Sequence, residues 1–146
     1  MNIPRIALAT LGAFVGYFVI GAALFGLVPS LKTEFLKYPA VYRNQQGQMS
    51  HMPAGMAAMF LSMLALAVMY ATFYPTGGFS MAEGARSGAL FGALIGVFAI
   101  GAFVLHRYVN LNIGSKLAAQ QSVAYFLEWV VTGLLIGLIY RPVASR

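Results

Sequence analysis

The chain contains no cysteine, only three acidic residues and a charged fraction of 8%. The missing cysteine excludes disulfides, zinc–thiolate sites and thiol catalysis. Soluble domains carry about 25% charged and about 45–50% apolar residues, whereas 60% of these 146 residues are hydrophobic. Because so few charges cannot cover a water-facing surface of this size, the sequence predicts an integral membrane protein.

Four long apolar runs carry this prediction: residues 6–28, 53–74, 82–105 and 117–140. At about 1.5 Å per residue, each run can cross a hydrocarbon core of about 30 Å. Backbone groups in lipid must be hydrogen-bonded internally, so these runs are expected to be helices. The sequence predicts one all-α domain over residues 1–146, a polytopic membrane protein whose four transmembrane helices form a compact bundle. Both termini then lie on the same side, and the arrangement is compatible with two hairpin repeats.

The segments between the runs add local predictions. Residues 29–48 combine basic and aromatic side chains, which is typical of a segment at the lipid headgroups. With a net charge of +6 and no folded polar domain to carry a basic cluster, anionic lipid headgroups are expected partners and nucleic acid is not. Ser80 and Glu83 predict a capping box. Residues 75–78 predict a tight turn, which would make the second and third runs a close hairpin.

Glycines recur at four-residue spacing on three of the runs. The third run carries four in line, and the first and last runs carry a pair each: Gly84, Gly88, Gly92, Gly96, Gly12, Gly16, Gly133 and Gly137. Glycine weakens helices in water, whereas in lipid it lets helix backbones approach closely. The pattern predicts glycine-zipper packing faces, used either inside the protomer or between copies.

A methionine face runs along the second span at steps of three and four residues: Met49, Met52, Met56, Met59 and Met63. Two interpretations stay open. Thioethers are soft ligands, so Met49, His51, Met52 and Met56 are candidates for copper(I) binding. The alternative is flexible packing against neighbouring helices, for which no metal or other cofactor is needed.

Glu128 is the acid placed deepest in an apolar run, near the middle of the fourth. Other polar groups are predicted to share its helical face or its depth in the bilayer: Gln121, Tyr125, Thr132, Tyr17 and Ser62. A carboxylate in lipid is costly, so this face must look inward. Glu128 is then either a proton- or ion-linked site or a neutral acid hydrogen-bonded to a neighbour.

The sequence also resembles a known group of proteins. The likeness rests on Phe25-Gly26, on residues 74–78, on Glu83-Gly84-Ala85-Arg86-Ser87-Gly88 and on the run 133–142. These features are similar to those of short bacterial inner-membrane proteins that form four-helix domains of unknown function. The resemblance implies a four-helix fold in a bacterial inner membrane, and no substrate, cofactor or catalytic residue.

Two functions are predicted from these observations. No arrangement of side chains typical of catalysis is present in the sequence, so the protein is not expected to be an enzyme. The first function is that of a structural or accessory subunit, which docks with other membrane subunits or with its own copies through glycine faces. The alternative is a homo-oligomeric small transporter or channel, with Glu128 as its proton- or ion-linked site.

Overall fold

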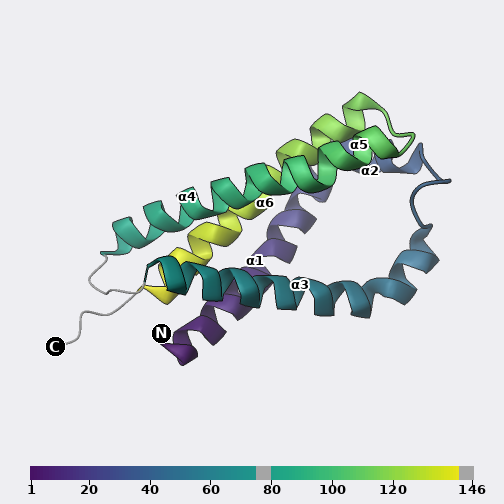
Figure 1. The fold of residues 1–146 in the computed structure, drawn as a ribbon. Helices are drawn as coiled ribbons and strands as arrows, with labels where there is room; N and C mark the ends of the chain where they lie inside the picture. The colour runs from purple at the N-terminus through teal and green to yellow at the C-terminus, as the bar shows by residue number, and fades with distance from the viewer. Residues whose placement is uncertain (75–79, 142–146) are drawn as a thin grey trace.

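The computed structural model describes residues 1–74 and 80–141, and the regular structure in these ranges is helical. The elements in chain order are α1 (Ile3–Leu27), α2 (Pro29–Leu36), α3 (Gln45–Phe73), α4 (Met81–Ala99), the π-helix η1 (Ile100–Leu105), α5 (His106–Asn110) and α6 (Ser115–Tyr140) (Figure 1). α4, η1 and α5 follow one another without a break. Together with α1, α3 and α6 they give four helices long and apolar enough to cross a membrane. The predicted class, an all-α polytopic membrane protein, is confirmed.

Side-chain caps begin three of the long helices. Asn2 caps α1 and Asn44 caps α3, each by accepting a hydrogen bond from the backbone N–H three residues further on. α4 begins with the predicted capping box, in which the Ser80 hydroxyl accepts from the Glu83 N–H and the Glu83 carboxylate accepts from the Ser80 N–H. These caps satisfy N–H groups that have no partner within the helix.

Two helices are longer than the apolar runs that predicted them. α3 begins at Gln45 and contains Pro53 in its interior, so the predicted headgroup segment 29–48 divides into α2, a linker and the first turn of α3. The third span continues through η1 to Asn110. Hydropathy did not indicate these extensions because the added turns are polar, as expected for helix ends that leave the hydrocarbon core.

α6 lies between its neighbours at the centre of the bundle. α4 runs antiparallel along one side of α6, and α1 crosses on the other side (Figure 1). The contact between α4 and α6 is the most extensive in the molecule, and that between α1 and α6 is the next. At one end of the bundle the Arg5 guanidinium donates to the Arg141 carbonyl, so the start of α1 and the end of α6 lie together.

α3 packs only along its second half. Its buried residues, Met63, Ala67, Tyr70 and Ala71, all lie there, against Ile6, Ala9 and Ala13 of α1. Towards its start, α3 diverges from the other helices (Figure 1), and almost every residue from Gln45 to Leu61 is exposed. We call the region between the end of α1 and the start of α3, which includes a cavity described below, the α1–α3 opening.

The predicted close hairpin of the second and third spans is wrong. α3 and α4 meet at one end, where the Tyr70 hydroxyl lies 2.6 Å from the Ser87 hydroxyl and the Tyr70 ring lies 5.5 Å from that of Phe91. Elsewhere they share almost no contact. The residues of the predicted turn, 75–78, lie outside the described part of the chain. The hairpin fails because α4 packs its glycine face on α6, while α3 packs on α1.

Candidate functional site

The predicted glycine faces of α4 and α6 lie against each other. A Cβ on Gly88 would approach the Gly137 Cα to 2.9 Å, and a Cβ on Gly137 would approach the Gly88 Cα to 2.7 Å. Gly84 and Gly92 are in similar contact with backbone atoms of α6, and Gly133 is in similar contact with those of α4. We call this contact the glycine seam. It lies inside the protomer, because the facing atoms belong to the same chain.

The remaining predicted glycines contact side chains. Gly96 faces Phe126, and Gly12 and Gly16 on α1 receive the ends of Ile139 and Leu135 from α6. By contrast, Gly26, Gly55 and Gly101 have open space where a Cβ would be. All eight glycines of the predicted packing set are therefore used between helices of one protomer, and a contact with another chain needs a different surface.

Glu128 lies in the contact between α6 and α1. It is 8% exposed, its carboxylate lies beside Gly21 and near the Tyr17 hydroxyl, and the Tyr17 ring lies 5.5 Å from that of Trp129. Hydrogen bonds between side chains across membrane helices stabilise their association. Glu128 and Tyr17 are thus brought together as the sequence predicted, on facing positions of α6 and α1.

The other predicted members of the polar group do not all join them. Ser62 is exposed on α3 and donates to the Ala58 carbonyl of its own helix, so its expected place beside Glu128 is wrong, because α3 packs on α1 and not on α6 at this depth. Gln121 is buried nearer the start of α6, and its side-chain amide donates to the Tyr42 hydroxyl at 3.2 Å. Thr132 is buried and Tyr125 is half-buried on α6.

The methionine face of α3 is buried at Met63 and becomes exposed towards the start of the helix. Met63 is fully buried, whereas Met56, Met52 and Met49 are 40%, 53% and 61% exposed. Their spacing keeps them on the side of α3 that carries Met63, so they continue that face beyond the part of α3 that packs on α1. The His51 Nδ1 atom lies 2.9 Å from the Gly47 carbonyl. Copper binding by His51 and the three exposed methionines stays a prediction.

The sequence did not indicate that α2 would be fixed to the start of α6. Glu34 is 3% exposed and lies 2.7 Å from the Lys37 ammonium and 3.0 Å from that of Lys116. Hydrogen bonds from Lys37 and then from Lys116 hold the pKa of Glu34 below its usual value of 4.5, and Glu34 raises the pKa of Lys37. The spacing of Glu34 and Lys37 is visible in the sequence, but Lys116 is distant along the chain.

Three further hydrogen bonds join the same segments. Gln120 donates to the Ser30 hydroxyl at 2.9 Å, and the Gly114 N–H donates to the Tyr38 hydroxyl at 2.9 Å. The third is the bond from Gln121 to Tyr42 at 3.2 Å. The segment from α2 to the linker is therefore anchored on α6 at both of its ends.

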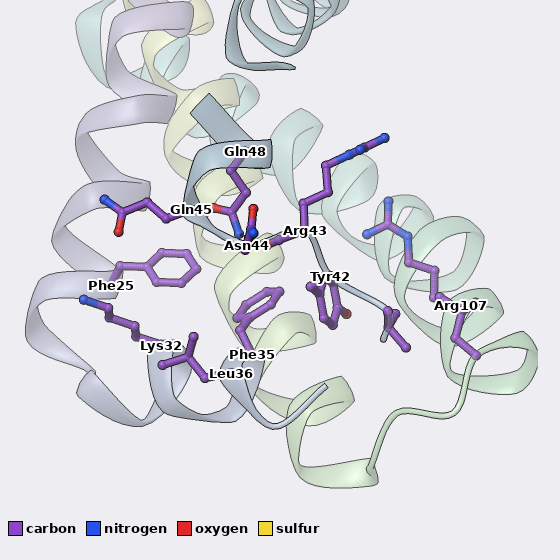
Figure 2. Close-up of a pocket in the computed structure, with 12 residues that line it drawn as sticks. Phe25, Lys32, Phe35, Leu36, Tyr42, Arg43, Asn44, Gln45, Gln48 and Arg107 are labelled. Atoms are coloured by element: carbon purple, nitrogen blue, oxygen red, sulfur yellow. Dashed lines mark hydrogen bonds between the residues drawn. The ribbon is translucent and has the colours of Figure 1, made fainter. Parts of the chain in front are cut away.

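A cavity of about 870 Å³ lies at the polar end of the α1–α3 opening. Its walls come from the end of α1, α2, the linker, the start of α3 and α5. Three cations and three aromatic rings contribute to the lining: Lys32, Arg43, Arg107, Phe25, Phe35 and Tyr42. In Figure 2, Lys32 lies on one side near Phe25, and Arg43 and Arg107 lie on the other. We call this cavity the basic cavity.

Together, these features define a polytopic membrane protein in which α4 and α1 pack on two sides of α6 and the second half of α3 packs on α1. No family model, curated protein or solved structure matches this chain.

Proposed function

We propose that the protein is an accessory subunit of a bacterial inner-membrane complex, which docks a transmembrane helix of a partner subunit on the methionine face of α3. The observation that carries this proposal is the change along that face. Met63 is fully buried against α1, while Met49, Met52 and Met56 continue the same face at the same spacing and are exposed. A face that packs on a helix at one end is suited to pack on a second helix at the other.

The chemistry of this face supports a helix as the occupant. Methionine is unbranched and flexible, and methionine-rich surfaces adapt to partners of different shape. Steps of three and four residues are those of a helix–helix seam. Gly55 lies among these methionines with open space around it, which allows a partner backbone to approach closely.

The position of the glycines changes how docking is expected to occur. The glycine seam packs α4 closely on α6, whereas the first half of α3 is exposed and is therefore the surface available to a partner. The proposed bacterial inner-membrane location rests on the resemblance to short proteins of that membrane, and the four apolar spans are compatible with it.

Site-specific crosslinking tests the proposal. Because the chain has no native cysteine, a thiol-directed reagent reacts only at the cysteine that is introduced. Met52→Cys and Met56→Cys, labelled in membranes with a thiol-directed photoreactive group, are expected to give one protein adduct of defined mass. Leu94→Cys on α4, where the side chain is 72% exposed, is the matched control and should give lipid adducts only. Equal adduct patterns at Met52→Cys and Leu94→Cys would refute docking on this face.

The homo-oligomeric transporter or channel remains the second prediction, and the adduct mass separates it from the first. An adduct of two copies of this chain favours the homo-oligomer, whereas an adduct with a different protein favours the accessory subunit. In the structure, the Glu128 carboxylate faces Tyr17 and Gly21 within the α1–α6 contact. A path past Glu128 would therefore need that contact to open.

A further inference from the structure

The basic cavity has a charge that nothing near it balances. Lys32, Arg43 and Arg107 come from α2, the linker and α5, and none of them forms an ion pair within residues 1–74 and 80–141. The acid closest to them in the fold, Glu34, is already paired with Lys37 and Lys116. The whole chain has only two other acids. The cavity therefore attracts an anion.

The position of the cavity places this charge at the edge of the bilayer. α1 ends at Leu27, α3 begins at Gln45 and α5 ends at Asn110, so the polar ends of three membrane helices surround it. This is the level at which lipid phosphates lie. Arginine guanidinium groups match the geometry of phosphate oxygens and bind them with paired hydrogen bonds.

The aromatic wall indicates an amphiphile and not a free ion. The Phe25 and Phe35 rings are 5.8 Å apart, and the Phe35 and Tyr42 rings are 4.7 Å apart. They form a continuous apolar surface beside the cations, and at about 870 Å³ the cavity is much larger than a phosphate ion needs. An occupant with a charged head and an apolar body satisfies both parts of the lining.

The walls are also held in place before any ligand binds. α2 and the linker are anchored on α6 through Glu34, Ser30, Tyr38 and Tyr42. The Gln48 side chain donates to the Arg43 carbonyl at 2.8 Å, which fixes the backbone that carries the Arg43 guanidinium. A pre-organised site loses less freedom when it binds its ligand.

We propose that the basic cavity binds the headgroup of an anionic phospholipid, with its phosphate between Arg43 and Arg107 and its glycerol and upper acyl chain against the rings of Phe35 and Tyr42 (Figure 2). Three cations favour a headgroup with a net negative charge. A zwitterionic headgroup would bring its own ammonium group close to the guanidinium groups. This inference is independent of the partner docked on the methionine face.

Lipid binding to the purified full-length protein tests the proposal, measured by native mass spectrometry with lipid added to detergent micelles. Phosphatidylglycerol is expected to bind saturably with one high-affinity site, and phosphatidylcholine is expected to bind much more weakly. Arg43→Gln combined with Arg107→Gln should weaken phosphatidylglycerol binding about tenfold or more, because each lost guanidinium removes charged hydrogen bonds. Arg86→Gln, which removes an exposed cation at the opposite end of the bundle, should leave the affinity unchanged.

The same experiment separates the possible outcomes. Inorganic phosphate that displaces phosphatidylglycerol at equal concentration would show a free-anion site and overturn the lipid assignment. Binding that is unchanged in the double variant, or weakened equally by Arg86→Gln, would overturn the site itself. Should the double variant fail to accumulate in membranes, the single variant Arg107→Gln provides the same comparison, since the Arg107 side chain is exposed on α5. Crosslinking at Met52→Cys would be unaffected by any of these results.

Discussion

Gly92 of α4 and Gly133 of α6 lie in direct backbone contact. A Cβ on Gly133 would lie 2.5 Å from the Gly92 Cα, and a Cβ on Gly92 would lie 3.1 Å from the Gly133 Cα. Both neighbours are backbone atoms, which cannot rotate away as the end of a side chain can. The glycine seam therefore sets the distance between the two helices, and any side chain on it must push them apart.

Gly133→Ala is expected to destabilise the protein by about 1–3 kcal/mol, as overpacking of a well-packed core does. Gly55→Ala is the matched control. Its site is open, so the higher helix propensity of alanine should leave stability unchanged or raise it by up to about 1 kcal/mol. Thermal unfolding in detergent measures both. Equal midpoints for the two variants would show that the seam does not determine stability.

Gly12→Ala should have a smaller effect than Gly133→Ala. The atom that a Cβ on Gly12 would meet is the terminal Cδ1 of Ile139, and an isoleucine can change rotamer to make room. The same unfolding measurement ranks the three glycine variants. A larger loss for Gly12→Ala than for Gly133→Ala would contradict the assignment of α4–α6 as the tighter contact.

Glu128 and Tyr17 are expected to be energetically coupled. Tyr17→Phe and Glu128→Gln form a double-mutant cycle, in which side-chain hydrogen bonds between membrane helices contribute about 0.6 kcal/mol on average and up to about 1.7 kcal/mol. Glu128→Gln should assemble normally, because an amide can still bond to the Tyr17 hydroxyl. Additive single effects would show that the two groups do not interact. Loss of a pH-dependent ion flux in Glu128→Gln would instead favour the transporter.

Acid should loosen α2 from α6 through Glu34. Its pKa is below 4.5 in the fold, first because of Lys37 and then because of Lys116, so the unfolded state binds the proton more readily. The contribution of the pair is therefore fully present above pH 4.5 and is lost as the pH falls through the lower, folded pKa. The protection of α2 amides against hydrogen exchange, measured relative to the intrinsic exchange rate at each pH, should fall in that range. In Glu34→Gln the protection of the same amides should be low and independent of pH, and protection that matches the wild type at every pH would contradict the anchoring role.

The sequence alone predicted the membrane-spanning helices and some of the helix faces that pack against other helices. Apolar length predicted four membrane helices, the four-residue glycine spacing predicted a packing face on α4, and the cost of a charge in lipid predicted that Glu128 looks inward. Each of these depends on one helix and its solvent, so it can be read from a single stretch of sequence. The capping box of Ser80 and Glu83 is local in the same way.

Which helices pack against each other could not be predicted from single stretches of sequence. In lipid, apolar surface does not select a neighbour, because the solvent is as apolar as the helix. The partner of α3 is determined by how Ala67 and Ala71 fit against Ala9 and Ala13, all of which are fully buried, and small residues are common on every span. The basic cavity was missed for a related reason, since its cations come from three separate elements.

The size of the complex in which this chain travels tests the account most directly. Wild-type protein, extracted in mild detergent and weighed by native mass spectrometry, is expected to carry a distinct membrane subunit. Met52→Trp, which places a bulky ring on the methionine face, should release that subunit without lowering the thermal midpoint of the protomer, whereas Leu94→Trp should retain it. A wild-type protein that travels as a single chain, or a Met52→Trp variant that keeps its partner, would contradict the proposed docking.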